Sequence, residues 1–406
     1  MRYVIIGASA AGCKAAETLR RYAPQSPITV ISEEPKPLYS RPLLTYLLSG
    51  EVSRDKVWLK GEDYFQEWGF VPVLGEQVVR VDPEAHGVHL RGGSVIPYDR
   101  LLIASGARPR RLGLTGEDLE GVFSLRTLAD WQRLEAGLPR EGRVVVVGAG
   151  AVGLKAAEAL QRRGLKVSLV EAESHALPRM VDETAAGLLQ QALRDMGIEL
   201  ELNARPVAVL GASGRVRALA LADGREIPGQ AVLLAVGVTP NVEFLAGTNL
   251  AEVNGIPVDN QMATQAPDIF AAGDCALPYH LLTKKRGAYQ IWPAAVAQGR
   301  VAGANLAGAG LTYDGLLPQN SLSLRGFHMI TGGLGPQETA DCDIVRELDA
   351  RRGHYRRLVY REGKLVGLTL VGPVTDAGIY FQLMAQQLPV KEPVQPGSRS
   401  ARSLRA

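Results

Sequence analysis

Two segments of the chain share one pattern of apolar and polar positions. Apolar runs at residues 3–6 and 144–147 each lead into a turn of small residues, Gly-Ala-Ser-Ala-Ala-Gly at 7–12 and Gly-Ala-Gly-Ala-Val-Gly at 148–153. A helix-compatible stretch follows each turn. A strand, a glycine-rich turn and a helix in this order form a phosphate site, in which a pyrophosphate lies at the helix N-terminus. The pattern therefore predicts two dinucleotide-binding βαβ units.

An acidic residue completes each unit. Glu33 ends the next apolar run of the first unit, and Glu171 ends that of the second. A carboxylate at this position accepts hydrogen bonds from the ribose hydroxyls of an adenosine. The first turn departs from the pattern at Ser9, where a second glycine commonly lets the diphosphate approach the backbone. Two nucleotide cofactors in one chain suggest that they exchange a hydride.

The second half of the chain repeats the order of the first. In both halves short alternating strands follow the acid-ended strand, and then an apolar strand ends in small residues, at 100–106 and 231–237. Long apolar strands separated by helical segments favour a parallel sheet covered on both faces. We therefore expect an α/β fold with two Rossmann-like domains, one inserted into the other.

Composition narrows the class of protein. The 406 residues are 46% hydrophobic and 21% charged, which is ordinary for a globular protein. A formal net charge of +3 is too small to indicate nucleic acid binding. No apolar run reaches the roughly 18 residues of a membrane span. The first strand begins close to Met1, which leaves no room for a signal peptide, so a cytoplasmic location is expected.

The three cysteines are Cys13, Cys275 and Cys342, and no two of them form a Cys-x-x-Cys pair. This spacing excludes a disulfide scaffold and an iron-sulfur or structural zinc site within the chain, so no metal site is predicted.

Four further segments carry a family resemblance. They are Tyr-Asp-Arg-Leu-Leu-Ile-Ala-Ser-Gly-Ala-Arg-Pro at 98–109, Ala-Val-Gly-Val-Thr-Pro-Asn at 235–241, Ile-Phe-Ala-Ala-Gly-Asp at 269–274 and Trp-Pro-Ala-Ala-Val-Ala-Gln-Gly at 292–299. The two glycine-rich turns at 7–12 and 148–153 are dinucleotide-binding fingerprints. With them, the chain resembles the FAD-dependent pyridine nucleotide oxidoreductases, the two-dinucleotide-binding flavoproteins, over about residues 1–310.

The resemblance implies a domain organisation. An FAD-binding domain spans 1–111 and 238–314, an NAD-binding domain at 112–237 is inserted into it, and a small α+β C-terminal domain covers 315–394. The tail at 395–406 is rich in Ser and Arg and is expected to be disordered.

The resemblance also assigns cofactor contacts. Asp274 would hold the ribityl chain of FAD, and the helix after Trp292 would point its positive end at the flavin. The implied FAD contacts are Gly7, Ser9, Ala10, Ala11, Gly12, Glu33, Arg41, Pro42, Val78, Ala104, Ser105, Gly106, Arg108, Gly273, Asp274 and Trp292. The implied NAD contacts are Gly148, Gly150, Ala151, Val152, Gly153, Glu171, Val236 and Gly237.

The segment at 39–46 lacks the redox cysteine of the family's disulfide reductases. It reads Tyr-Ser-Arg-Pro-Leu-Leu-Thr-Tyr, similar to rubredoxin reductases, ferredoxin reductases and the flavin portion of nitrite reductases. A thiol relay is excluded unless Cys13 or Cys275 serves, and a structural role is favoured for both. Electrons would then leave the flavin directly.

Two charged residues bear on the nicotinamide site. A 2′-phosphate beside Glu171 would face a carboxylate, which favours NADH over NADPH. Lys155 stands where many relatives have a glutamate near the nicotinamide. It either orients the carboxamide, as a catalytic residue, or pairs with a buried acid.

The predicted function is an NADH-dependent FAD oxidoreductase that reduces a small acidic electron carrier, a rubredoxin, ferredoxin or other iron-sulfur protein. The alternatives are an NADH oxidase that makes hydrogen peroxide and an NADH-responsive binding protein. Cationic clusters form a possible docking face for an acidic carrier. The oligomeric state stays open. The clusters are Arg108 with Arg110 and Arg111, Lys284 with Lys285 and Arg286, and Arg351, Arg352, Arg356 and Arg357.

Overall fold

The computed structural model describes residues 1–36 and 38–390, so the tail predicted to be disordered lies outside the described residues. Contacts between Cα atoms divide the chain into two compact units. Unit 1 comprises 1–43, 53–108 and 238–316, and unit 2 comprises 44–52, 109–237 and the described residues from 317 onward.

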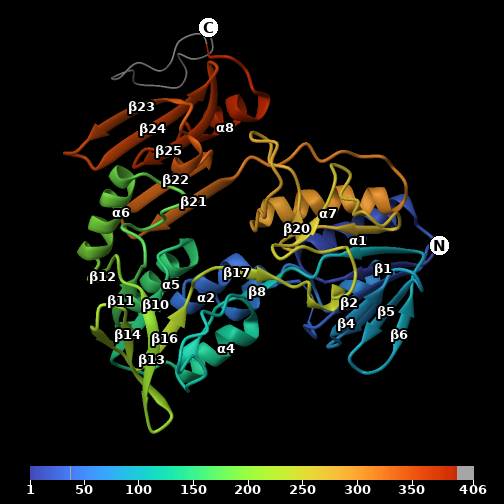
Figure 1. Cartoon of the computed structure of the whole chain (residues 1–406), viewed down its shortest axis with the longest axis horizontal. Coiled ribbons are helices and arrows are strands. Elements are labelled where there is room, and N and C mark those ends of the chain that lie inside the picture. The colour runs from blue at the N-terminus through green and yellow to red at the C-terminus, as the bar shows by residue number, and fades with distance from the viewer. Residues whose placement is uncertain (37, 391–406) are drawn as a thin grey trace. The chain divides into compact units, whose positions relative to one another are not determined.

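Unit 1 is built on a parallel sheet of five strands in the order β19-β7-β1-β2-β3 (Figure 1). Residues Tyr3, Val4, Ile5 and Ile6 of the central strand are all buried, because neighbours cover both faces of the sheet. The strands are β1 (Tyr3–Ile6), β2 (Ile28–Ser32), β3 (Val71–Leu74), β7 (Arg100–Ile103) and β19 (Ile269–Ala271).

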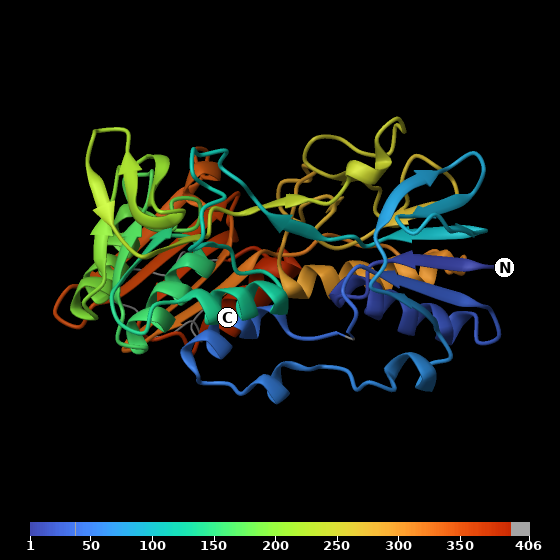
Figure 2. The same cartoon turned by 90° about the horizontal axis from the view of Figure 1, so that it is seen from below.

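Helices α1 (Ala10–Tyr22) and α7 (Trp292–Leu306) lie side by side in unit 1 (Figures 1 and 2). Two glycines of α7 permit this approach. A Cβ atom at Gly299 would lie 2.3 Å from the carbonyl oxygen of Ala11, and one at Gly303 would lie 2.3 Å from that of Ala15. The helix that follows the first fingerprint is thus packed against a helix from much later in the chain.

The rest of unit 1 consists of short elements. An antiparallel sheet contains β4 (Val78–Asp82), β5 (Gly87–Leu90) and β6 (Val95–Pro97), and β18 (Ile256–Pro257) pairs with β20 (Ala276–Leu277). The short helices are α3 (Tyr64–Glu67) and the 3-10 turns η1 (Arg41–Leu43), η2 (Arg54–Val57) and η3 (Glu243–Leu245). Strands β8 (Ala107–Pro109) and β17 (Val238–Pro240) form a two-stranded sheet.

Unit 2 contains a second parallel sheet, in the order β12-β11-β10-β16-β9. Its centre has the same arrangement as the first sheet. Strand β10, which leads into the glycine-rich turn, lies between β11 and β16, as β1 lies between β2 and β7. The strands are β9 (Val122–Phe123), β10 (Arg143–Val147), β11 (Lys166–Val170), β12 (Glu199–Glu201) and β16 (Ala231–Leu234). The helices are α2 (Leu44–Ser49), α4 (Leu128–Gly137), α5 (Ala151–Arg162) and α6 (Glu183–Asp195).

Two antiparallel sheets complete unit 2. The smaller one contains β13 (Pro206–Ala212), β14 (Arg215–Leu221) and β15 (Glu226–Pro228). The C-terminal sheet has the order β21-β22-β25-β24-β23, with α8 (Ala377–Gln386) packed on it. Its strands are β21 (Gln319–Leu324), β22 (Phe327–Gly333), β23 (Asp343–Asp349), β24 (His354–Arg361) and β25 (Lys364–Val371), and the 3-10 turn η4 spans Pro336–Glu338.

The C-terminal sheet shares a hydrophobic cluster with α5 and α6. Leu322, Phe327 and Tyr355 belong to the same buried cluster as Leu154 and Leu189. Contact grouping therefore unites the predicted C-terminal and NAD-binding domains in unit 2, and the three-domain division itself stays a prediction. The mixed α/β fold with two Rossmann-like sheets is as expected from the sequence. No helix within residues 1–36 and 38–390 is long and apolar enough to cross a membrane.

Candidate cofactor-binding site

The first glycine-rich turn connects β1 to α1 through a backbone that requires glycine at both ends. Gly7 has φ +111°, and a Cβ atom there would lie 2.1 Å from the carbonyl oxygen of Ala104. A Cβ atom at Gly12 would lie 1.8 Å from the carbonyl oxygen of Gly7. These contacts hold the turn against the end of β7, with Ser9 at the N-cap of α1.

The second turn has the same geometry in unit 2. Gly148 has φ +101°, and a Cβ atom there would lie 2.6 Å from the carbonyl oxygen of Ala235. A Cβ atom at Gly153 would lie 1.9 Å from the carbonyl oxygen of Gly148. A Cβ at Gly150 would meet no atom within 4 Å, and the adjoining Ala151 and Val152 are exposed. Open space therefore faces the N-terminus of α5, as a bound pyrophosphate requires.

The carboxylate beside the first turn is that of Glu34. Arg41 Nη2 donates to Glu34 Oε1, and Tyr39 Oη donates to Glu34 Oε2 at 2.6 Å. Arg41 Nε also lies 3.4 Å from Ser9 Oγ. Glu33, the acid predicted to bind ribose, is exposed. The structure thus brings Glu34 and Arg41 to the turn through contacts that the sequence pattern did not reveal.

Asp274 adds a second negative charge near this cluster. Burial opposes the charge of Arg41, yet the Glu34 carboxylate, with a smaller contribution from Asp274, raises the pKa of Arg41 above its ordinary value. Gly273 directly precedes Asp274. Its backbone N–H donates to Gln298 Oε1 of α7 at 2.8 Å. Ser9, Arg41 and Asp274 are therefore grouped, and their contact with FAD stays a prediction.

The strand end at 104–106 is tied to the segment after β17. Ser105 Oγ donates to the carbonyl oxygen of Asn241 at 2.7 Å, and Asn241 Nδ2 donates back to that of Ser105 at 3.0 Å. A Cβ at Gly106 would meet no atom within 4 Å, so open space adjoins this loop. Two family segments far apart in sequence are thus joined in unit 1.

Glu171 lies directly against the second turn. Its Oε2 atom accepts from the backbone N–H of Ala149 at 2.8 Å, and its Oε1 atom accepts from that of Glu173 at 3.1 Å. These two bonds orient the carboxylate at the end of β11. A charged acceptor held beside the phosphate-binding turn suits a ribose diol.

Lys155 forms a partly buried ion pair. Its Nζ atom lies 2.6 Å from Glu158 Oε2, donates to the carbonyl oxygen of Ser323 at 2.9 Å and lies 4.6 Å from the ring centroid of Tyr46. Glu158 Oε1 accepts from the backbone N–H of Arg325 at 2.8 Å. The contacts correspond to the second alternative from the sequence, pairing with a buried acid, and the contact with nicotinamide stays a prediction.

The cysteines beside the flavin motifs are buried. Burial raises the pKa of Cys13 to about 12, and the Cys13 thiol donates to the carbonyl oxygen of Ala8 at 3.2 Å. Burial also raises the pKa of Cys275. Both side chains are therefore neutral thiols near neutral pH, poorly suited to relay electrons as thiolates.

The other predicted contacts have varied surroundings. Arg108 is paired with Glu243, and Trp292 begins α7 with a half-buried side chain. Among these other contacts, Ala10, Ala11, Val78 and Ala104 are buried, whereas Pro42, Val236 and Gly237 are more accessible.

Comparison with known proteins identifies the family and the fold. Residues 1–299 match the family model described as pyridine nucleotide-disulphide oxidoreductase. Rhodocoxin reductase from Rhodococcus erythropolis is 34% identical over 400 residues, covering 96% of this chain and 91% of that protein. An NADH oxidase from Methanocaldococcus jannaschii is 34% identical, covering 92% and 88%. The structure of a ferredoxin reductase from Rhodopseudomonas palustris superposes with a TM-score of 0.85 at 30% identity, covering 93% and 92%.

The chain belongs to the pyridine nucleotide-disulphide oxidoreductase family. It also resembles longer proteins over part of their length. The assimilatory nitrate reductase electron transfer subunit and the NAD(P)H nitrite reductase of Bacillus subtilis are each 29% identical, and the chain spans 48% of each.

Proposed function

We propose that the protein is an NADH-dependent FAD oxidoreductase that passes electrons directly to a small iron-containing electron carrier. The neutral, buried state of Cys13 and Cys275 carries this proposal. Segment 39–46 contains no cysteine, and Cys342 lies in unit 2 between η4 and β23. With no thiolate beside the first turn, electrons have no disulfide relay and must leave to an external acceptor.

FAD would be held in unit 1. Its pyrophosphate would lie at the N-terminus of α1, where the unpaired backbone N–H groups and the guanidinium of Arg41 attract negative charge. Glu34, held by Arg41 and Tyr39, would accept the ribose hydroxyls in place of Glu33. When bound, FAD converts a two-electron hydride donation into two one-electron steps. The task of these residues is to bind and orient it.

NADH would be held in unit 2, at the open N-terminus of α5. The Glu171 carboxylate, fixed by the N–H groups of Ala149 and Glu173, would accept the ribose diol and repel a 2′-phosphate. This arrangement supports a preference for NADH over NADPH.

The names of similar proteins support the choice of acceptor. Besides the rhodocoxin reductase, a rubredoxin-NAD(+) reductase of Pseudomonas putida is 30% identical over 367 residues. A ferredoxin–NAD(+) reductase component of the p-cumate dioxygenase system is 37% identical over 276 residues. A rubredoxin or a ferredoxin is therefore the acceptor class we assign.

Rapid mixing tests the assignment. The purified holoenzyme is reduced anaerobically with NADH and mixed with rubredoxin, a ferredoxin or oxygenated buffer, while flavin absorbance is followed. Fast reoxidation by an iron protein with slow reoxidation by O2 is expected. Slow reoxidation by every iron protein and fast reoxidation by O2 would reject it.

A second candidate is an NADH oxidase, favoured by the similarity to the Methanocaldococcus protein. Because no thiolate is available, the product expected from O2 is hydrogen peroxide rather than water. A stoichiometric peroxide assay during NADH turnover in air distinguishes the two products.

A further inference from the structure

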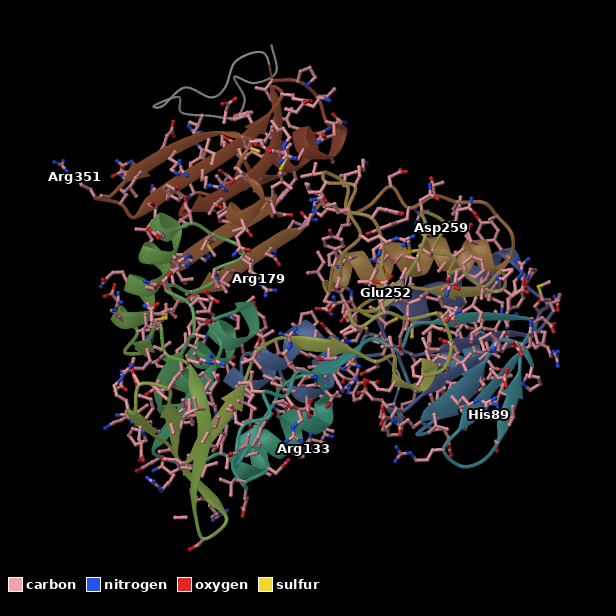
Figure 3. All side chains as sticks on the ribbon, viewed as in Figure 1. His89, Arg133, Arg179, Glu252, Asp259 and Arg351 are labelled. Atoms are coloured by element: carbon pink, nitrogen blue, oxygen red, sulfur yellow. The ribbon has the colours of Figure 1, made fainter. Side chains whose placement is uncertain are left out.

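The cationic clusters predicted as docking surfaces differ in their ion pairing. Most of their arginines are neutralised by carboxylates of the same unit. The pairs are Arg108 with Glu243, Arg111 with Glu117 and Asp118, Arg352 with Asp349, Arg356 with Glu347, and Arg357 with Asp182. Arg110 and Arg351, which projects from the turn between β23 and β24, are each followed by a paired arginine (Figure 3). Each of these two clusters therefore keeps one exposed arginine, Arg110 or Arg351, without an ion pair among the described residues.

The cluster at Lys284, Lys285 and Arg286 is different. All three residues are exposed, and none lies within 4.0 Å of a carboxylate among the described residues. Arg286 stacks on Tyr279, with its guanidinium 5.0 Å from the ring centroid. Within the part of the chain that the structure describes, the two lysines have no such ring contact, and they carry the free charge of the cluster.

Nearby carboxylates offset part of the charge of Arg286. Arg286 lines a pocket of about 360 Å³ together with Glu252 and Asp259, both labelled in Figure 3. Lys284 and Lys285 do not line this pocket. The positive surface of the loop is therefore centred on the two lysines.

A buried histidine forms hydrogen bonds with the backbone of the loop that carries the lysines. The side chain of His280 is 3% exposed, and its Nδ1 atom accepts from the backbone N–H groups of Leu282 and Thr283, at 3.0 and 3.2 Å. The backbone N–H of His280 donates to the carbonyl oxygen of Lys285 at 2.9 Å. An ordered loop loses less entropy when a partner binds than a flexible loop does.

The position of the loop in unit 1 relates it to the flavin. It follows β20 and precedes α7, so it connects Gly273 and Asp274 to Trp292, all three of which are expected FAD contacts. A protein that binds the loop would therefore contact the same chain segment that carries the expected FAD contacts Asp274 and Trp292 at its two ends.

We propose that Lys284 and Lys285 form the docking site for an acidic electron-carrier protein. The inference rests on the proposed function, since it specifies where the carrier binds. Opposite charges would accelerate encounter and align the carrier, with an effect that decreases as salt screens the charges. The loop contributes no group to electron transfer itself.

The test uses the holoenzyme with both charges reversed, Lys284→Glu with Lys285→Glu. At low ionic strength, kcat/KM for rubredoxin should fall about tenfold or more, and added salt should reduce the difference from the unchanged protein. The dissociation constant for oxidised rubredoxin, measured by calorimetry without turnover, should rise in parallel. The rate with menadione, a small neutral acceptor, should not change.

Arg91→Glu with Arg140→Glu is the matched control, because both arginines are exposed, lack an ion pair among the described residues and give the same change in net charge. The control should keep near-normal rubredoxin kinetics. Equal losses in both double variants, or no loss in the lysine variant, would overturn the docking site. Failure of the unchanged holoenzyme to reduce rubredoxin or ferredoxin would instead overturn the proposed function.

Discussion

Lys155 and Glu158 form an ion pair of 2.6 Å one turn into the helix that follows the second fingerprint. The first fingerprint is followed by the same sequence, Lys-Ala-Ala-Glu, yet Lys14 Nζ lies 4.0 Å from Glu17 Oε2. Glu17 pairs instead with Lys60, at 2.5 Å. The repeated sequence therefore has two different partners, because each unit packs a different segment against its helix.

Removal of the Lys155 charge should destabilise the protein. In Lys155→Met, Glu158 would stay buried with the N–H of Arg325 but without its cation, so the free energy of unfolding should fall by roughly 2 to 4 kcal/mol. Lys155→Arg should recover part of the loss. Urea unfolding of each variant measures the effect.

Lys14→Met is the control at the equivalent position, and its cost should stay below about 1 kcal/mol because Lys60 still pairs with Glu17. The rate of anaerobic flavin reduction by NADH separates the roles of Lys155. A near-normal rate in Lys155→Met indicates that Lys155 has a structural role. A large decrease at unchanged NADH affinity would support the predicted contact of Lys155 with the nicotinamide.

The two neighbouring acids after β2 should differ in their effect on FAD. Glu34→Gln removes the charge that Arg41 and Tyr39 contact, so the dissociation constant for FAD should rise about tenfold, the equivalent of one charged hydrogen bond. Glu33→Gln should change it little, because Glu33 is exposed. Flavin fluorescence during titration of the apoprotein gives both constants. A larger effect at Glu33 would support the prediction made from the sequence.

The carboxylate of Glu171 should determine the choice of nicotinamide cofactor. Glu171→Gln keeps the size of the side chain but removes the charge, so kcat/KM for NADH should fall about tenfold while that for NADPH stays equal or rises. Glu173→Gln, which alters a neighbouring exposed acid, serves as the control. Steady-state kinetics with both cofactors is the measurement, and a preference of the unchanged protein for NADPH would reject this role of Glu171.

The cysteines should differ in their reactivity toward iodoacetamide. The pKa of Cys13 is raised to about 12, so its thiolate becomes appreciable only as pH approaches that value, and Cys275 is shifted in the same direction. In the native holoenzyme at mildly alkaline pH, Cys342, which is partly exposed, should be the cysteine that is modified. Mass spectrometry of tryptic peptides measures this. Rapid labelling of Cys13 in the folded protein would support the alternative that this thiol relays electrons.

Two glycine-to-alanine changes should have opposite effects on stability. Gly299→Ala would place a Cβ 2.3 Å from the carbonyl oxygen of Ala11, so α7 must shift and stability should fall by about 1 to 3 kcal/mol. Gly187→Ala, in α6 with no atom within 4 Å of the new Cβ, should raise stability by about 0.5 to 1 kcal/mol. Denaturant midpoints compare the two, and a stabilising Gly299→Ala would contradict the close packing of α1 and α7.

The sequence predicted the elements whose pattern is local. Strand β1 has the predicted bounds, and β10, β7 and β16 lie at the apolar runs predicted at 144–147, 100–106 and 231–237. These features depend on residues that are neighbours in the chain.

The sequence could not give partners that are distant in the chain. Lys155 contacts Ser323 and Tyr46 from two other segments, and Arg41 pairs with Glu34 rather than with Glu33, the residue directly after β2. Which arginines of a cluster are neutralised likewise depends on carboxylates brought in by the fold. Side-chain pairing of this kind has no periodic signal in one sequence.

The late position of β19 and α7 affects how the chain folds as it is synthesised. The parallel sheet of unit 2 takes all its strands from residues 122–234, whereas that of unit 1 includes β19 at 269–271, which pairs with β7, and its helix layer needs residues up to 306. During synthesis from the N-terminus, β1, β2 and α1 emerge first but must wait with apolar surface uncovered. The parallel sheet that begins first in the sequence is therefore the later of the two to be completed on the ribosome.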